Sequence, residues 1–369
     1  MPNILINGLK ANAGGGKNIL VNYLNSLKDT PTEHFYYILC PDAAEFRHLE
    51  SESMRIIDVR DMFKLNLLFL GLYFYELPRI LLRYKIDLIF NFGDIIIPTS
   101  RNQIYFFDWA YAVYDEDYIW KRMGLKDLLM RKTKVCLIKF YIRKVDLVLA
   151  QTNVINRRLR EKYGIKEVET MPTPISDLEG ESNEFHDFRL PKEKMKFLFP
   201  AGWAPHKNFE LIVQLSQWIY KNKLPYLLVL CVQQQDIEQY LAGIQQETIV
   251  NLGKIQGKYM NALYQQCDAL LLPSLIESYG LPYIEAMAHN LPIVTSDLDF
   301  AHEMCGDLAL YFNPFDMESA GEAMLESQSI SKNEQLKELR KEKLSNISDW
   351  PTTVIKIQDF INHILTKKI

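Results

Sequence analysis

The sequence predicts an α/β protein built from two open parallel β-sheets with crossover helices. Three observations support this fold class. The chain has 369 residues, which is enough for two domains that each bury their own core. Short apolar runs alternate with longer helical patterns through the first half of the chain. The same rhythm starts again in the second half, so we expect two successive sheets.

The first half contains five candidate strands, each a short run of branched or aromatic residues. They are ILIN at 4–7, FYYIL at 35–39, KIDLIFNF at 85–92, QIYFF at 103–107 and VDLVLAQT at 145–152. The apolar stretch from Leu65 to Leu82 is interrupted by polar residues and by Pro78. We therefore expect a core helix there rather than a membrane span.

A segment with two prolines and few apolar residues, VETMPTPISDLEG, ends at residue 180. We place the domain boundary there, with a first domain over 1–180 and a second over 181–349. The strands of the second domain are KFLFPAG at 196–202, YLLVLCV at 226–232, IVNLG at 249–253, ALLLPS at 269–274 and PIVTS at 292–296. Apolar residues near helical spacing predict a last helix over 350–369, which packs back across the lobes.

The composition excludes several classes of function. The formal net charge of −4 offers no global attraction to nucleic acid. The five cysteines are odd in number, widely spaced and without a CxxC pair, which argues against a disulfide framework or a zinc site. The first residues lack the pattern of a secretory leader, so we expect a cytoplasmic protein.

The densest signal is the run ALLLPSLIESYGLPYIEAMAHNLPIVTSD at 269–297, which predicts a strand, a short loop, a helix and a strand. Glu277 lies in the loop, and Gly280 permits close backbone approach. Amide groups at the helix start, at Gly280 and Leu281, can bind phosphate. Glu285 on the first turns can accept hydrogen bonds from vicinal hydroxyls. Taken singly, the two glutamates also suit an exposed loop and a helix dipole.

Together these residues resemble the signature of retaining family-4 glycosyltransferases, glycosyl transferases group 1, which have the GT-B fold. The shared features are PS, a glutamate, an aromatic-Gly-Leu-Pro turn and EAMA, with the second glutamate eight positions after the first. The resemblance implies two Rossmann-like domains that face each other across a cleft. It implies a nucleotide-diphosphate sugar as co-substrate and no metal or other cofactor. It also implies that Glu277 contacts the transferred sugar and that Glu285 binds the ribose.

A second match is KFLFPAGWAPHKNFELIVQL at 196–215, which resembles the diphosphate-binding segment of the family. Gly202 ends the strand, and Lys207 at the helix start offers a positive charge to a diphosphate. The family usually has an arginine after the glycine, whereas this sequence has Trp203. Lys254 is a candidate substitute for that arginine, although a solvated lysine fits the pattern equally well.

The first domain carries two weaker matches to the family. ANAGGGKN at 11–18 resembles the glycine loop placed against the donor, and Gly15 and Gly16 permit close approach. The family has a histidine-aspartate pair after a middle strand, where this sequence has Phe107 and Asp108. Asp108 can accept a hydrogen bond from the sugar or the acceptor. The resemblance thus assigns catalytic roles to Glu277, Lys207 and Asp108.

Two acidic triplets, Asp297–Asp299 and Asp115–Asp117, have the spacing of a metal-diphosphate site. The first also suits a turn or a helix cap, and the family resembled needs no metal. We therefore expect no metal site.

Residues 121–144 form a basic stretch in which lysines and arginines alternate with apolar side chains, and Asp127 is its only acid. Two interpretations fit this pattern equally. One is peripheral contact with the inner face of an anionic membrane, as a lipid-linked acceptor requires. The other is a solvated helix on the outside of the domain.

The function that the resemblance implies is transfer of a hexose-type sugar to a glycan or lipid-linked acceptor with retention of anomeric configuration, in bacterial surface polysaccharide synthesis. The alternatives are a nucleotide-sugar epimerase, a phosphorylase and a non-catalytic partner subunit. Trp203 and Phe107 leave the last of these open, while the GLPYIEAMA context favours transfer.

Overall fold

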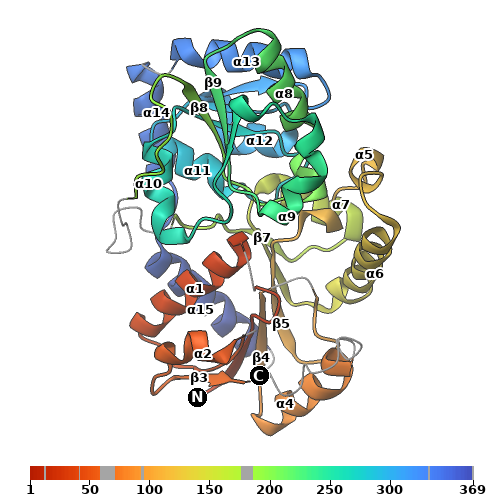
Figure 1. Ribbon diagram of the computed structural model, residues 1–369. Helices are drawn as coiled ribbons and strands as arrows, with labels where there is room; N and C mark the ends of the chain where they lie inside the picture. The colour runs from red at the N-terminus through yellow and green to blue at the C-terminus, as the bar shows by residue number, and fades with distance from the viewer. Residues whose placement is uncertain are drawn as a thin grey trace. The chain divides into compact units, whose positions relative to one another are not determined.

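The computed structural model describes residues 1–11, 14–40, 42–58, 71–92, 95–175, 186–330 and 333–367. The chain divides into two compact units, each with its own parallel sheet (Figure 1). The first unit contains residues 1–115, 124–174 and 348–369, and the second contains 116–123 and 175–347. The predicted fold class is confirmed. The predicted boundary at residue 180 lies outside the described residues.

The sheet of the first unit has the strand order β3-β2-β1-β4-β5-β6-β7, with every pair parallel. Its strands are β1 (Asn3–Asn7), β2 (Phe35–Leu39), β3 (Met54–Ile57), β4 (Leu88–Phe92), β5 (Asn102–Phe107), β6 (Leu147–Ala150) and β7 (Val168–Thr170). The order reverses between β1 and β4. In open parallel sheets, such a reversal creates a crevice at the carboxyl ends of the strands.

The helices of the first unit cover both faces of this sheet (Figure 1). They are α1 (Gly14–Asp29), α2 (Ala43–Phe46), α4 (Leu77–Arg83), α6 (Leu125–Tyr141), α7 (Asn153–Tyr163) and α15 (Trp350–Thr366). A π-helical turn, η4 (Leu72–Glu76), leads into α4. The shorter 3-10 turns are η1 (Arg47–Leu49), η5 (Ala110–Ala112) and η6 (Ile142–Lys144).

The last helix, α15, confirms the predicted C-terminal helix. Its residues Val354, Ile357 and Ile361 are fully buried, in the same core cluster as Leu20 and Tyr23 of α1. The chain therefore returns to the first unit after completing the second. This helix is part of the first unit's core, because its apolar stripe is covered there.

The sheet of the second unit has the order β10-β9-β8-β11-β12-β13 and is also parallel. Its strands are β8 (Met195–Phe199), β9 (Tyr226–Leu230), β10 (Ile249–Asn251), β11 (Ala269–Leu272), β12 (Ile293–Ser296) and β13 (Ala309–Phe312). The order reverses between β8 and β11, the two central strands. The ten predicted strands are all present, whereas β3, β7 and β13 were not predicted.

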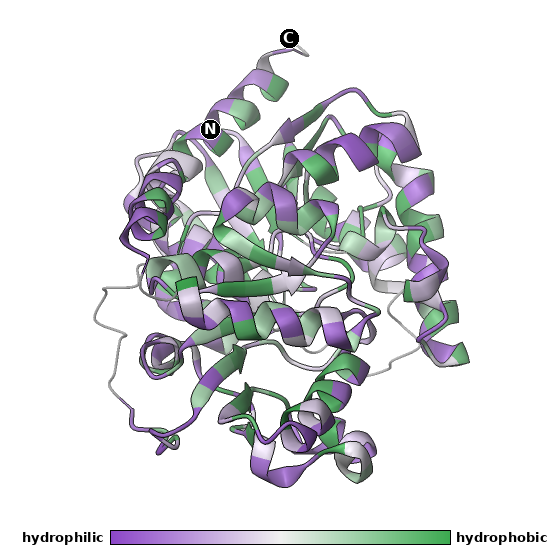
Figure 2. Ribbon diagram, turned by 90° about the horizontal axis from the view of Figure 1, so that it is seen from above, coloured by the Kyte–Doolittle hydropathy of each residue, from purple (hydrophilic) through white to green (hydrophobic). Residues whose placement is uncertain are grey.

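The helices of the second unit are α5 (Asp117–Trp120), α8 (Phe209–Lys221), α9 (Gln234–Ile237), α10 (Met260–Gln265), α11 (Leu281–Ala288), α12 (Asp299–Cys305), α13 (Met317–Ile330) and α14 (Glu334–Ser345). Its 3-10 turns are η7 (Pro205–Lys207), η8 (Glu238–Gly243), η9 (Gln246–Thr248), η10 (Gly257–Tyr259) and η11 (Gly306–Leu308). Figure 2 shows that the strands are largely hydrophobic, whereas the helices carry both hydrophobic and hydrophilic residues. This is the pattern of sheets buried on both faces.

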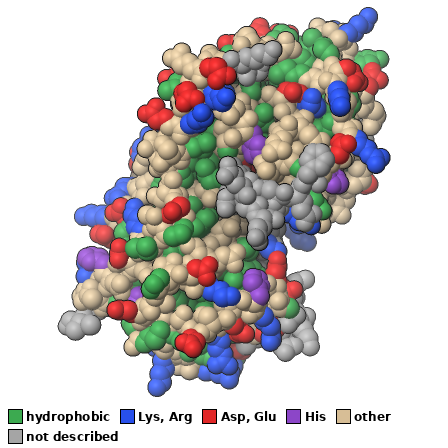
Figure 3. Space-filling view, turned by 90° about the vertical axis from the view of Figure 1, so that its left-hand side faces the viewer, with side chains coloured by type: hydrophobic (Ala, Val, Ile, Leu, Met, Phe, Trp, Pro, Cys, Tyr) green, Lys and Arg blue, Asp and Glu red, His purple; other side chains and the backbone are tan. Residues whose placement is uncertain are grey.

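The surface agrees with the small net charge of the chain. Acidic and basic side chains are interspersed on the face shown in Figure 3. Among the described residues, none of the helices has the length and hydropathy needed to cross a membrane. Within the predicted core helix, residues 65–70 lie outside the described residues, and the rest forms η4 and α4.

Candidate functional site

The carboxyl ends of β8 and β11 bring together two segments that are about seventy residues apart in sequence. The two strands are neighbours at the point where the strand order reverses. The backbone N–H of Leu275, after β11, donates to the carbonyl oxygen of His206, after β8, at 2.8 Å. This hydrogen bond ties the two loops together at the edge of the sheet where ligands of open α/β folds bind.

Lys207 and Glu277, one from each loop, form an ion pair with a hydrogen bond from Lys207 Nζ to Glu277 Oε1. Their side chains are only 14% and 12% exposed. Asn208 holds the lysine loop in place, because its buried side-chain Nδ2 donates to the carbonyl oxygen of Pro314 at 2.8 Å. The structure thus brings together two of the predicted catalytic residues.

Gly280 is the N-cap of α11 and has a backbone conformation that favours glycine, with φ of 83°. A Cβ at this position would lie 2.6 Å from Cδ2 of the Tyr283 ring. The ring cannot move aside easily, because its hydroxyl is hydrogen-bonded to Thr295 Oγ1 at 2.8 Å and is buried. The glycine therefore allows α11 to start at Leu281. The positive end of the helix dipole then lies near Glu277 in the preceding loop.

Glu285 lies on α11 and accepts a hydrogen bond from the Tyr264 hydroxyl at 2.6 Å. Burial raises the pKa of the Glu285 carboxyl, and the hydrogen bond from Tyr264 opposes that shift. The Tyr264 ring stacks on His289 at 5.1 Å between centroids. Tyr264 is a residue that the sequence analysis missed. In the sequence, Tyr264 is one tyrosine among the apolar positions of a short helix, and no motif distinguishes it from a core residue.

Trp203 occupies the position where the family has an arginine, and here it packs against the core of the second unit. Its Nε1 donates to the Tyr240 hydroxyl at 3.1 Å. Gly202 beside it is exposed, and a Cβ there would meet open space. Lys254 is exposed in the turn after the edge strand β10, with β9 between that strand and β8. The role of Lys254 as a substitute stays a prediction.

In the first unit, the glycines start α1 and do not lie in the predicted loop. Gly14 has φ of 58°, whereas the loop residues Asn12 and Ala13 lie outside the described residues. A Cβ at Gly16 would come 3.1 Å from Asp108 Oδ2. The first turn of α1, which contains Gly15 and Gly16 and follows β1, therefore lies close in space to Asp108, which follows β5.

Asp108 is the predicted catalytic residue of the first unit. Burial raises the pKa of its carboxyl to about 6. Its buried Oδ1 has no hydrogen-bond partner among the described residues. Phe107, at the family's histidine position, is fully buried and contacts Tyr105 at 6.0 Å between ring centroids. It belongs to the core of the unit.

The residue after Asp108 reveals a further contact that the sequence did not indicate. Lys134 of α6 places its Nζ 4.2 Å from the centroid of the Trp109 ring. Burial and, to a smaller extent, the nearby positive charge of Lys10 lower the pKa of Lys134 to about 7. A desolvated lysine against the residue that follows Asp108 is the kind of feature that clusters at functional sites.

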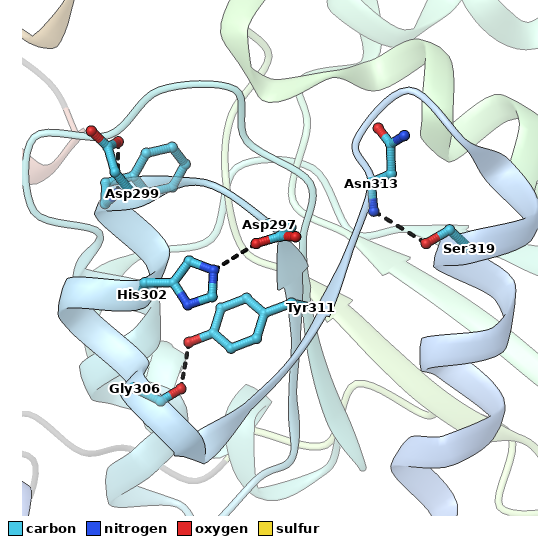
Figure 4. Close-up of polar contacts among 8 residues, drawn as sticks. Asp297, Asp299, His302, Gly306, Tyr311, Asn313 and Ser319 are labelled. Carbon is cyan, nitrogen blue, oxygen red and sulfur yellow. Dashed lines mark hydrogen bonds and ion pairs between the residues drawn. The ribbon is translucent and has the colours of Figure 1, made fainter.

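The two acidic triplets hold their carboxylates in separate interactions. Figure 4 shows Asp297 turned toward His302, whose Nε2 lies 2.6 Å from Asp297 Oδ1. Asp299 accepts the backbone N–H of Phe300 at 2.9 Å instead. Asp115 accepts a hydrogen bond from Lys162 Nζ at 2.6 Å, and Asp117 forms an ion pair with Lys121. No group of three or more metal-ligating side chains is found within the described residues.

Residues 181–343 match the family model described as Glycosyl transferases group 1. Among curated proteins, the chain is similar to the O-antigen chain mannosyltransferase RfbU of Salmonella typhimurium (strain LT2). The two are 27% identical over 189 residues, which cover 50% of this chain and 51% of that protein. The chain therefore spans about half the length of this curated relative.

Two solved structures have a similar fold over almost their whole length. Sucrose-phosphate synthase from Thermosynechococcus elongatus is 15% identical with a TM-score of 0.74, and the match covers 100% of both chains. Anabaena Alr3699/HepE in complex with UDP-glucose is 13% identical with a TM-score of 0.69, covering 98% of this chain and 100% of the other. The similarity to Glycosyl transferases group 1 thus lies in residues 181–343, and the whole chain has a GT-B fold.

Proposed function

We propose that this protein is a retaining glycosyltransferase that uses a nucleotide-diphosphate sugar as donor. It transfers a hexose-type sugar to a glycan or lipid-linked acceptor in bacterial surface polysaccharide synthesis. The donor binds at the carboxyl end of the second unit's sheet. The observation that supports this proposal most strongly is the Lys207–Glu277 pair, placed beside the start of α11 at the strand reversal.

The pair suits a diphosphate-linked sugar because it offers a cation and a carboxylate side by side. In the proposed complex, Lys207 moves from Glu277 to the diphosphate, and the start of α11 contributes its positive dipole end. Glu277 is then available to accept hydrogen bonds from sugar hydroxyls. Glu285 accepts the ribose hydroxyls, and the Tyr264 hydrogen bond orients its carboxylate.

In the reaction, the bond between the anomeric carbon and the diphosphate oxygen breaks, and a bond to the acceptor oxygen forms on the same face of the sugar. The acceptor hydroxyl loses its proton to the departing phosphate oxygen. Lys207 and the helix start stabilise the negative charge that develops on the diphosphate. Asp108 is the predicted contact for the acceptor hydroxyl or the sugar in the first unit.

The relatives support the donor class and the pathway. RfbU is named as an O-antigen chain mannosyltransferase, and the Anabaena structure contains UDP-glucose. Both names concern hexoses, and one concerns a surface polysaccharide. They are the reason for choosing a hexose-type donor for this chain.

A panel of nucleotide sugars, each with and without candidate lipid-linked glycans, tests the function. We expect acceptor-dependent release of a nucleoside diphosphate and a product whose anomeric configuration, measured by NMR, matches that of the donor. Inversion would contradict the retaining mechanism. Conversion of the donor without an acceptor would indicate an epimerase, and dependence on free phosphate would indicate a phosphorylase. Absence of nucleotide binding would indicate a non-catalytic subunit.

A further inference from the structure

Two lysines of the first unit lie near each other in surroundings that are poor for positive charge. Lys134 belongs to α6, and Lys10 follows the carboxyl end of β1. Both side chains are half-buried. Burial lowers the pKa of each lysine, and the charge of Lys10 also lowers the pKa of Lys134. Like charges act on each other in this way only at short range, so we treat the two as one positive centre, the lysine pair.

Helix α6 holds Lys134 against the segment that follows β5. Lys134 Nζ lies 4.2 Å from the centroid of the Trp109 ring. One turn earlier, the guanidinium carbon of Arg131 lies 4.3 Å from the centroid of the Tyr111 ring. Ile138, one turn later, is the buried residue of the helix. Lys134 therefore lies on the inner face of α6, because residues at these spacings share one side of a helix.

Asp108 lies directly before Trp109 and is a separate feature of this edge of the sheet. The pKa of its carboxyl is raised by burial, whereas a close ion pair with a lysine would lower it. Its buried Oδ1 has no hydrogen-bond partner among the described residues. The edge thus offers a carboxyl that suits a hydroxyl and, near it, a positive centre.

A lysine on an aromatic ring can be a simple packing contact, with its stem on the ring and its ammonium in water. Such a lysine keeps an ordinary pKa, whereas the pKa of Lys134 falls to about 7. The fold therefore holds two ammonium groups near each other and partly out of water. A bound dianion would offset their repulsion. Groups held in such unfavourable surroundings are typical of functional sites.

We propose that the lysine pair binds a phosphate or diphosphate group of the acceptor, whose reacting hydroxyl lies near Asp108. This inference rests on the proposed function, in which Asp108 contacts the acceptor. In that function Lys207 and the start of α11 already serve the donor diphosphate, so a second positive centre suits the second substrate. A phosphate ester carries a charge of about −2, which matches two ammonium groups. A neutral glycan fits less well, because its hydroxyls compensate such charges poorly.

Two kinds of acceptor carry this chemistry: a soluble sugar phosphate and a glycan joined to a lipid through a diphosphate. Three acceptors with the same sugar separate them, namely the 1-phosphate, the diphosphate ester of a short-chain polyprenol and a neutral alkyl glycoside. We expect one of the charged acceptors to have a KM at least about tenfold below that of the glycoside. Preference for the 1-phosphate would identify a soluble acceptor, and preference for the diphosphate ester a lipid-linked one. Equal KM values for all three would overturn the proposal.

Lys134→Met and Lys10→Met remove the charges and keep the apolar stems. Each variant should raise the KM of the preferred charged acceptor about tenfold or more, without changing that of the neutral glycoside. The matched control is Lys139→Met, an exposed lysine of the same helix, which should behave as the wild type does. Weaker binding of UDP or GDP by Lys134→Met would assign the lysine pair to the donor and overturn the proposal. Thermal melting confirms that each variant is folded.

A binding measurement without donor separates failure of this site from failure of the proposed function. NMR of protein labelled at the lysine ε-carbons follows the pKa of Lys134, whose signal is the one missing from Lys134→Met. Inorganic pyrophosphate should raise that pKa, because a bound anion favours the ammonium form, and should do so equally in Lys207→Met. An unchanged pKa would overturn the proposal even if transfer is observed. A raised pKa in a protein without transfer would support the phosphate site and count against the proposed function.

Discussion

The carboxyl ends of the two sheets differ in how their acidic side chains are compensated. In the second unit, Glu277 is paired with Lys207, and Glu285 accepts a hydrogen bond from Tyr264. In the first unit, Asp108 keeps a buried oxygen without a hydrogen-bond partner among the described residues, and burial raises its pKa. The second unit thus holds its charged groups in preorganised pairs, whereas the first holds a carboxyl in an environment that disfavours its charged form.

This difference suggests different uses of the two edges. Paired groups that can exchange their partner for a ligand suit the binding of a diphosphate. A carboxyl whose pKa lies near neutrality suits proton exchange or hydrogen bonding with a hydroxyl. Four substitutions test whether the two edges differ in this way.

Glu277→Gln should reduce sugar transfer by about a hundredfold or more, because the neutral amide can neither pair with Lys207 nor bind the sugar as a carboxylate does. Turnover with the best donor of the panel is the measurement. Asp268→Asn is the matched control: Asp268 pairs with Lys196 at 2.6 Å across the same two strands, at their amino ends. Similar turnover in the two variants would remove Glu277 from the site.

Gly280→Ala should destabilise the second unit by about 1–3 kcal/mol and weaken donor binding, because the backbone is left-handed and the added Cβ collides with Tyr283. Urea unfolding followed by fluorescence measures the change. Gly202→Ala, where the added Cβ meets open space, should change the free energy of unfolding little. If both alanines are tolerated equally, the strained start of α11 is not required.

Asp108→Asn should make the first unit more stable at pH 7, by about 1–3 kcal/mol, while lowering transfer. The folded-state pKa of about 6 lies above the unfolded value. Ionised Asp108 therefore costs stability, and the wild-type free energy of unfolding falls as pH rises from about 4 to about 6. The advantage of the variant should vanish near pH 4. An advantage that is equal at pH 4 and pH 7 would show that the Asp108 charge is not its cause.

Tyr264→Phe should have the smallest effect, a loss of about 1 kcal/mol in donor binding or in the free energy of unfolding. Removing the hydroxyl should raise the pKa of Glu285 further, since that hydrogen bond now opposes the effect of burial. As the pH is lowered, Glu285 should become protonated earlier in the variant. The variant should therefore lose donor affinity at a higher pH than the wild type does. Identical pH profiles would show that Tyr264 does not tune Glu285.

The fold and half of the site could be predicted because the information is local. Glu277, Gly280 and Glu285 lie in one motif whose strand, loop and helix follow from adjacent residues. The strands that escaped prediction are short edge strands, such as β13, where three of four residues are only partly buried. Their apolar pattern is weak because one side faces solvent.

The remainder of the site depends on contacts between distant segments. The pairing of Lys207 with Glu277 requires that β8 and β11 be neighbours, which no local pattern encodes. The packing of Trp203 also could not be predicted, because it depends on a hydrogen bond to Tyr240, which lies 37 residues later in the chain. The first turn of α1 differs from the predicted loop because three successive glycines resemble a flexible segment in sequence, although helix starts tolerate them.

Titration calorimetry measures whether the Lys207 end of the second sheet binds a nucleoside diphosphate. UDP and GDP are titrated into the wild-type protein, Lys207→Met and Lys196→Met. Lys196 lies in β8 and Lys207 in η7, which follows that strand; the two have similar exposure, 13% and 14%, but lie at opposite ends of the sheet. We predict that one nucleotide binds to the wild type and to Lys196→Met, and that binding to Lys207→Met is lost or at least tenfold weaker. Equal binding to both variants, or none to the wild type, would show that the Lys207 end of the sheet is not a nucleoside diphosphate site.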